Sequence, residues 1–393
     1  MFCVECGKEN VESARFCAAC GKTIQSLARS GVSSHVVDKH KESMLQSIGD
    51  RISNLASTDK LEGFSLRDFF SEVFKKRDAS EVDEYFVVGT PRTTPSIEDV
   101  PTGWPKPWFF LRVLIFVGLV YLGFYIAFQQ FGNPKLIPGL IMMGSLAVPL
   151  ATVILFFELN LPRNVSFNRV LMLVASGGVV SLFVALVGFS VSDLGWLGAS
   201  QAGIVEEIGK LLAVVIIARS FKGKYILNGL LFGAAVGAGF AFFESAGYAF
   251  EFLEKSGKLD VMFDVIQVRA LLTPFGHVAW TAIAAGALWR VKGDQPFQLG
   301  MLFESSFLKT MAIPMLLHMA WDSPFSSPFD LHLVVLGVIG WFVVFGLVQQ
   351  GLRQIKHEQL QISHAKAIKA ELLANAPLVH PALIVPQGKI AQA

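Results

Sequence analysis

Charged residues are scarce in this chain. Asp, Glu, Lys and Arg make up only 16% of its 393 residues, whereas 53% are hydrophobic. Soluble domains carry about 25% charged residues, so this composition is typical of a protein embedded in a membrane. The formal net charge of +2 is small, and no polar stretch concentrates basic residues. A nucleic-acid partner is therefore not expected.

Cysteine is also scarce, and all four cysteines, Cys3, Cys6, Cys17 and Cys20, lie in the first twenty residues. They form two C-x-x-C pairs, each followed by a glycine, a spacing that lets four thiolates surround one tetrahedral zinc ion. The head resembles a small zinc ribbon with a structural Zn²⁺, and a redox dithiol is the alternative. Reduced thiols and the lack of a signal-peptide core predict a cytosolic head, with a cytosolic protein partner for the ribbon.

Four regions follow from the change in composition along the chain: a zinc ribbon at 1–25, a polar cytosolic linker at 26–107, a transmembrane core at 108–350 and a charged cytosolic tail at 351–393. Within the linker, residues 60–78 carry apolar side chains near helical spacing, which predicts an amphipathic helix. That helix is expected either on the membrane surface or in a small domain.

The core contains about eight apolar segments, each near the ~20 residues that a bilayer requires. They lie near 108–130, 136–157, 170–191, 202–219, 226–250, 274–291, 306–323 and 331–350. The fold class predicted is an all-α polytopic membrane protein. With the N-terminus inside, the inner loops carry more Lys and Arg than the outer ones, so both termini are expected in the cytosol.

Several charges interrupt the apolar segments, although a charge at the bilayer centre costs ~2.5 to 3.5 kcal/mol. They fall in four consecutive predicted spans and are Glu206, Glu207, Lys210, Glu244, His277, His318 and Asp322. Counted from the outer ends of the predicted spans, the acids and histidines lie ~5 to 9 Å deep, so one shared site near the outer face is expected. Spacings of four residues place Lys210 on the face of Glu206, and Asp322 on that of His318.

Carboxylates and imidazoles at one depth permit metal-assisted hydrolysis, because zinc lowers the pKa of bound water to about 7 and a glutamate can move its proton. The hypothesis assigns Glu206 or Glu207 as general base. Glu244, His277 and His318 are then ligands of a second, catalytic zinc or activators of the water. Asp322 orients His318, and Lys210 anchors a glutamate.

The motifs E-E-x-x-K at Glu206, F-x-x-x-E ending at Glu244, a lone His277 and H-x-x-x-D at His318 resemble those of the PrsW family of intramembrane proteases, distant relatives of the CAAX prenyl endopeptidases. The resemblance covers roughly residues 108–350. It implies a bacterial cell-membrane protease that cuts membrane-anchored substrates such as anti-sigma factors. It leaves open whether zinc or an unmetallated Glu and His pair activates the water.

The main alternative is a proton- or cation-coupled transporter, because acids and histidines also form relays. A transporter of this kind is expected to contain two related halves. The sequence has no such internal repeat, and its buried acids lie in the second half alone.

Overall fold

The structure is a computed structural model that describes residues 47–219, 221 and 223–374. The cysteine-rich head, with the expected zinc site, lies outside these residues, as does the end of the tail. The chain divides into two units, Met1–Ile48 and Gly49–Ala393, and the fold below is that of the second. Its described residues form helices joined by turns and no β-strand, so the predicted all-α class is confirmed.

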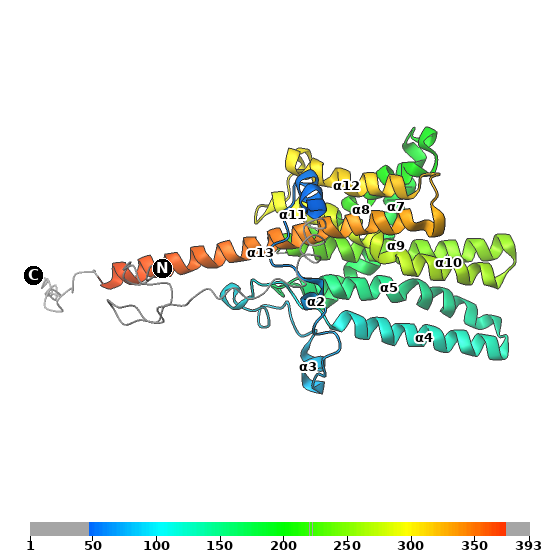
Figure 1. Cartoon of the computed structure of the whole chain (residues 1–393), viewed down its shortest axis with the longest axis horizontal. Coiled ribbons are helices and arrows are strands. Elements are labelled where there is room, and N and C mark those ends of the chain that lie inside the picture. Colours follow the sequence, from blue (N-terminus) through cyan, green and yellow to red (C-terminus); the bar gives the residue numbers. More distant parts are fainter. Residues whose placement is uncertain (1–46, 220, 222, 375–393) are drawn as a thin grey trace, which may run out of the picture. The chain divides into compact units, whose positions relative to one another are not determined.

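Six stretches of the described residues are long and apolar enough to cross a membrane, so the protein is a multi-pass membrane protein. Figure 1 shows the bundle that the helices form. The six stretches contain α4 (Phe109–Phe131), η2 and α5 (Pro134–Leu136 and Ile137–Leu159), α6, η3 and α7 (Phe167–Met172, Leu173–Gly177 and Gly178–Val191), α9 (Ile226–Ser256), α10, η5 and α11 (Leu259–Leu272, Thr273–Phe275 and His277–Lys292), and α13 (Leu331–Ala374). Two shorter helices, α8 (Ala202–Ala218) and α12 (Ser305–Trp321), have 17 residues each and coincide with the other two expected spans. The count of eight therefore stays a prediction.

Helix α9 is the centre of the bundle and packs against α5, α7, α8, α10 and α11. Gly229, Gly233 and Gly237, which repeat every four residues, all face α11. A Cβ atom on Gly233 would lie 2.2 Å from the Thr281 carbonyl oxygen, and one on Gly237 would lie 2.4 Å from the His277 carbonyl oxygen. These glycines therefore allow α11 to approach α9 closely.

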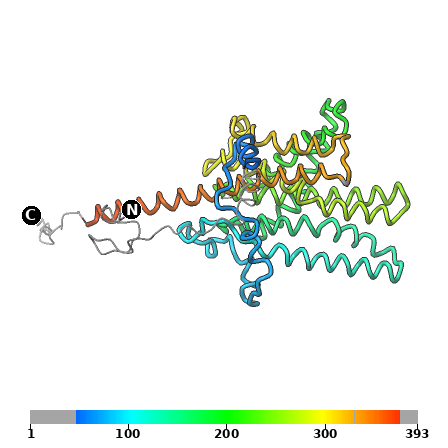
Figure 2. The backbone as a smooth tube through the Cα atoms, viewed as in Figure 1, coloured from blue at the N-terminus to red at the C-terminus, as the bar shows by residue number. Residues whose placement is uncertain are grey.

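A helix that the sequence did not predict, α10, folds back along α9 (Figure 2). It occupies a stretch that the sequence interpretation left as a loop between the spans at 226–250 and 274–291. Met262, Phe263 and Ile266 of α10 pack with Phe128 and Leu140 of the α4–α5 hairpin in a second apolar cluster. The chain then breaks at η5 and resumes as α11, so α10 and α11 form one interrupted span.

The described part of the expected linker packs on the end of the bundle opposite the α9–α10 turn. Its short helical stretches include residues 47–56, α2 (Leu66–Phe69), α3 (Ala79–Glu84) and η1 (Ile97–Asp99). The expected amphipathic helix at 60–78 is helical only over α2, because the Ser65 side chain caps it and turns follow. Phe64 contacts Trp104 and Phe345 instead, with ring centroids 4.6 Å apart in both pairs. This segment therefore shares the apolar core of the spans.

Candidate active site

Three buried charges lie on α8. Glu207 and Lys210 have no exposed surface and Glu206 retains 7%. The Lys210 ammonium lies 2.7 Å from Glu207 Oε1 and 3.6 Å from Glu206 Oε2, and it sits over the Phe240 ring, 4.5 Å from the centroid. Because α8 turns about 100° per residue, one lysine three and four residues on reaches both acids. Lys210 thus partly neutralises a pair of carboxylates that the apolar surroundings would otherwise exclude.

The first residue of α11, His277, lies between α8 and α9. Its Nε2 is 2.9 Å from Glu244 Oε2 on α9, and its Nδ1 is 2.9 Å from the Lys210 ammonium. A carboxylate only accepts, so Nε2 carries the proton and Nδ1 the lone pair. Arg269 on α10 pairs with Glu244 and donates from Nε to Ser245 Oγ at 3.0 Å. The unpredicted helix α10 therefore holds the carboxylate that orients His277.

On α12, His318 is 2% exposed and stacks on the Trp280 ring of α11, with centroids 4.5 Å apart. Its Nδ1 lies 2.9 Å from Glu207 Oε1, so this nitrogen is the donor. Its Nε2 then faces Asp322 Oδ2 at 3.2 Å with a lone pair. Two lone pairs repel at that distance, so a proton or a cation has to lie between these atoms for the contact to be favourable.

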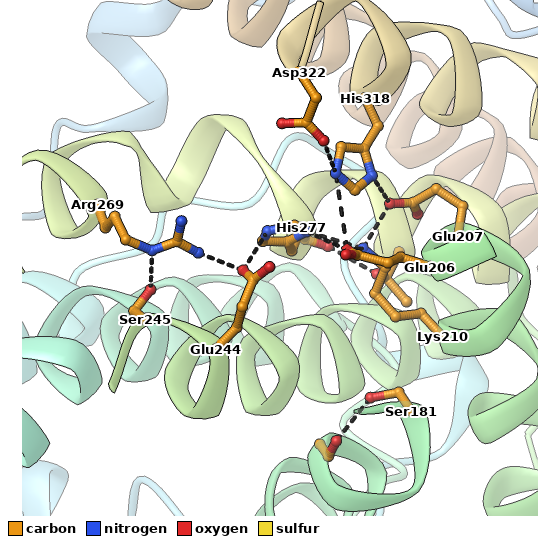
Figure 3. A network of polar contacts seen from close by, with 12 residues as sticks. Ser181, Glu206, Glu207, Lys210, Glu244, Ser245, Arg269, His277, His318 and Asp322 are labelled. Carbon is orange, nitrogen blue, oxygen red and sulfur yellow. Dashed lines mark hydrogen bonds and ion pairs between the residues drawn. The ribbon is translucent and has the colours of Figure 1, made fainter. Parts of the chain in front are cut away.

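Two buried carboxylate oxygens of the cluster, Glu206 Oε2 and Glu207 Oε2, are left without a hydrogen bond. Glu206 Oε2 is buried and unbonded, and it lies 3.8 Å from His318 Nε2 and 4.0 Å from His277 Nδ1. Figure 3 shows the two imidazoles converging on it, each held from its other side by a different glutamate. When no proton lies between His318 Nε2 and Asp322, the cluster presents three unprotonated atoms to one small volume that a cation can occupy: Glu206 Oε2, His277 Nδ1 and His318 Nε2.

These atoms fit the donor set of a zinc ion. One ligand atom from each of Glu206, His277 and His318 falls within a group spanning 4.8 Å, and tetrahedral bonds of about 2.0–2.1 Å separate ligands by about 3.4 Å. Each imidazole also donates its other N–H to a carboxylate, the partner that a metal-bound histidine usually has. Lys210 contacts His277 Nδ1, so the ammonium and a metal compete for that nitrogen.

The cluster opens into a cavity of about 320 Å³. Polar side chains line one part of it, among them Glu206, Glu244, Arg269, His277, His318 and Asp322. Glu207 does not line it, because its carboxylate is enclosed between Lys210 and His318. Of the two adjacent glutamates that sequence could not separate, Glu206 is the one that can meet water.

The level of the site can be read from two paired helix ends. Asn228, near the start of α9, donates to Asn160 at the end of α5 over 2.8 Å. From Asn228, α9 rises sixteen residues, about 24 Å, to Glu244, whereas α5 has 23 residues and spans about 34 Å. The site therefore lies about 10 Å below the level at which α5 begins, in the third of the bundle next to the α4–α5 turn.

The structure brings together all seven side chains that the sequence singled out. In the set expected to bind a metal, Glu244 instead contacts the far nitrogen of His277, and Glu206 takes the central position. Sequence reasoning missed Arg269, which lies between two expected spans, and Trp280, which lies inside one. Thr273 and Pro274, where the structure interrupts the helical backbone, were the available sequence signal that another helix could precede α11.

Comparison with known proteins agrees with this site. Residues 165–348 match the PrsW family of intramembrane metalloproteases. Over this stretch the chain resembles the PrsW family. Residues 2–24 match a zinc-ribbon domain, as the cysteine spacing predicted. No curated protein and no solved structure is detectably similar to the chain.

The PrsW match contains every residue of the buried cluster and begins after α5. It is shorter than the expected range of 108–350, so α4 and α5 precede the family segment. These two helices still contact the site region, because α5 packs on α9 and the α4–α5 hairpin packs on α10. The second apolar cluster joins the α4–α5 hairpin to α10, the helix that carries Arg269.

Proposed function

We propose that this chain is an endopeptidase that hydrolyses peptide bonds of membrane-anchored proteins, with Glu206 as the proton acceptor. The observation that carries the proposal is the buried, unbonded Glu206 Oε2 between the lone-pair nitrogens of two histidines. A water molecule bound there has an acceptor for its proton and lies beside the polar cavity of about 320 Å³. The match of residues 165–348 to the PrsW family supports the same reaction.

The steps balance as an ordinary hydrolysis. Glu206 Oε2 takes a proton from water while the water oxygen attacks the peptide carbonyl carbon, which forms the new C–O bond. The same carboxyl then gives its proton to the amide nitrogen as the C–N bond breaks. Arg269 lines the cavity and has N–H groups left after binding Glu244 and Ser245, so it supplies donors for the carbonyl oxygen.

The remaining charged residues orient these groups. Glu207 and Glu244 fix the rings of His318 and His277 by accepting one N–H from each. A zinc ion held by Glu206, His277 and His318 would lower the pKa of its water to about 7 and polarise the carbonyl. With such an ion bound, Glu206 would be a ligand, so its substitution is expected to remove cleavage in either case, and metal content distinguishes the two roles.

The test is cleavage of single-span reporter proteins in vesicles containing the purified full chain. Glu206→Gln is expected to remove cleavage by at least about 10²-fold, the usual contribution of a general base. The matched control is Glu254→Gln, an exposed glutamate on α9, which should cleave at the wild-type rate. Cleavage by Glu206→Gln at the wild-type rate would show that Glu206 is not the base. Proton or cation uptake without any cleavage would support the transporter alternative.

Metal content separates the two ways of activating water. With Cys3, Cys6, Cys17 and Cys20 all replaced by Ser, the zinc of the ribbon is lost. A remaining equivalent of zinc that disappears on adding His318→Ala would assign it to the membrane cluster. Full activity in a chain without zinc would assign catalysis to Glu206 and the histidines alone.

The substrate class and location are part of the same proposal. Single-pass regulators of the anti-sigma type, cut near the outer face of the bacterial cell membrane, agree with the level of Glu244 in the bundle and with the charge asymmetry of the loops. In this orientation the ribbon and tail face the cytosol, where the ribbon would meet a protein partner. Protease protection of tags at either terminus of cells expressing the chain tests the orientation.

A further inference from the structure

A second cavity, also of about 320 Å³, adjoins the polar one and lies between α7 and α9. Apolar side chains from facing helix surfaces line it, chiefly Leu182, Leu186, Phe189, Phe240, Phe243 and Tyr248. On α7 and on α9 these residues recur at three- and four-residue spacing, so each helix offers one face. This space is called the α7–α9 groove below.

The groove is continuous with the candidate active site. Glu206 and Glu244 line both cavities, and so do Phe189 and Tyr248. An apolar ligand in the groove would therefore contact the proposed base at one end. Among the residues that line it there is no Lys or Arg, so the groove itself offers nothing to a polar anion.

The groove opens to the side of the bundle that lipid covers. Phe183, Leu186 and Val187 on the outward half of α7 are 66%, 66% and 44% exposed. Gly247 on α9 also lines the groove, and a Cβ atom built on it meets nothing within 4 Å. A helix approaching through the lipid would find here a concave apolar surface with room left by a missing side chain.

We infer that the α7–α9 groove docks the single transmembrane helix of the protein substrate and delivers one end of that helix to Glu206. This inference rests on the proposed peptidase function and names how its substrate is recognised. Helical backbone in lipid keeps its hydrogen bonds, and unwinding it there costs several kcal/mol per unsatisfied group. The polar cavity next to the groove supplies partners for a short unwound stretch, which hydrolysis requires. The apolar groove thus suits the helical part of the substrate, and the polar cavity suits its short unwound stretch.

Docking is tested by photocrosslinking, independently of cleavage. The probe is a biotinylated peptide of about 23 Leu and Ala residues that forms a single transmembrane helix, reconstituted in vesicles with the full chain carrying Glu206→Gln. A photoreactive phenylalanine replaces Leu186 in the groove or, as a control, Leu119, which is 60% exposed on α4. Crosslinking is expected from position 186 to exceed that from 119 by about tenfold, equivalent to about 1.4 kcal/mol of preference.

Blocking the groove provides the matched comparison. Gly247→Leu fills the open space without a backbone clash and should reduce crosslinking from position 186 to the level seen at 119. Gly123→Leu on α4, where an added Cβ also meets nothing within 4 Å, should leave it unchanged. Equal crosslinking at both positions, or no effect of Gly247→Leu, would overturn the docking site.

The two proposals fail separately. If the crosslinking pattern is as expected but wild-type chain cleaves no single-span reporter, docking stands and the peptidase proposal fails. If reporters are cleaved but crosslinking shows no preference for the groove, the peptidase stands and substrate reaches Glu206 by another route. With both intact, Gly247→Leu should also lower the rate of reporter cleavage by about tenfold, again about 1.4 kcal/mol.

Discussion

Lys210 and Glu207 provide the sharpest test of how the membrane tolerates this cluster. Both side chains are fully buried, and their charged atoms lie 2.7 Å apart. Replacing one member of a buried pair leaves an uncompensated charge, which costs about 3–5 kcal/mol of folding free energy. Lys210→Met and Glu207→Gln are each expected to destabilise the protein by that amount.

The double variant distinguishes pairing from mere burial. Glu206 loses Lys210 equally in the Lys210→Met single and in the double, but only the single also leaves Glu207 charged without its lysine. The cost of the double should therefore be smaller than the sum of the single costs by about 2–3 kcal/mol. The quantity to measure is the free energy of unfolding in mixed detergent micelles, for the wild type, the two singles and the double. Activity is not informative here, because Glu207 also orients His318.

An exposed pair serves as the control cycle. Lys255 and Glu251 on α9 are four residues apart and 2.5 Å in separation, but their side chains are 70% and 44% exposed. Water screens such a pair, so its coupling should be close to zero. A coupling between Lys210 and Glu207 no larger than this control would refute the argument that the lysine is present to neutralise buried carboxylates.

Three further outcomes follow from the structure. Asp322→Asn should lower the rate of reporter cleavage by about 10- to 100-fold, because the Asp322 carboxylate stabilises the proton or cation that lies between it and His318 Nε2, 3.2 Å away. Asp322 is partly exposed, so the thermal midpoint should be unchanged. A wild-type rate would contradict this role. Gly237→Leu should prevent folding, measured as loss of a monodisperse peak, because an added Cβ would lie 2.4 Å from the His277 carbonyl oxygen. Gly247→Ala, in open space, is its control, and a monodisperse Gly237→Leu protein would show that α9 and α11 can separate. Glu158→Gln should lower the free energy of unfolding by about 1–3 kcal/mol. The Glu158 carboxylate accepts hydrogen bonds from the backbone N–H groups at the start of α4, those of Trp108, Phe109 and Phe110, at 2.6, 2.8 and 2.9 Å. An unchanged stability would mean that water replaces these bonds.

The parts of the site that sequence could predict are those fixed by one helix. Charges inside apolar segments mark function, and spacings of three and four residues place Lys210 beside Glu206 and Glu207. Which glutamate faces which histidine depends on how α8, α9, α11 and α12 rotate against each other, and no local pattern encodes that rotation. The expected metal set therefore included Glu244, whereas Glu206 is the acid near both free imidazole nitrogens.

Helix α10 was missed for a different reason. Asp260, Asp264 and Arg269 divide a stretch of only 14 residues, so neither its length nor its hydropathy resembles a span. Its apolar face is satisfied by the α4–α5 hairpin, a contact between distant parts of the sequence. The packing of Phe64 against Trp104 and Phe345 escaped prediction in the same way. The features that a single sequence does not predict are those fixed by contacts between distant segments rather than by helix propensity.

The charge balance of the cluster links its stability to its chemistry. Four carboxylates, from Glu206, Glu207, Glu244 and Asp322, face only two permanent cations, Lys210 and Arg269. With neutral histidines the formal charge is −2, an expensive value for an apolar site. Either protons on the imidazoles or one divalent cation at Glu206 Oε2 would cancel it. The excess negative charge thus favours binding of a cation that activates water, and it also favours transfer of a proton from that water to the cluster. Because the carboxylates repel one another, α8, α9, α11 and α12 have to hold them in place.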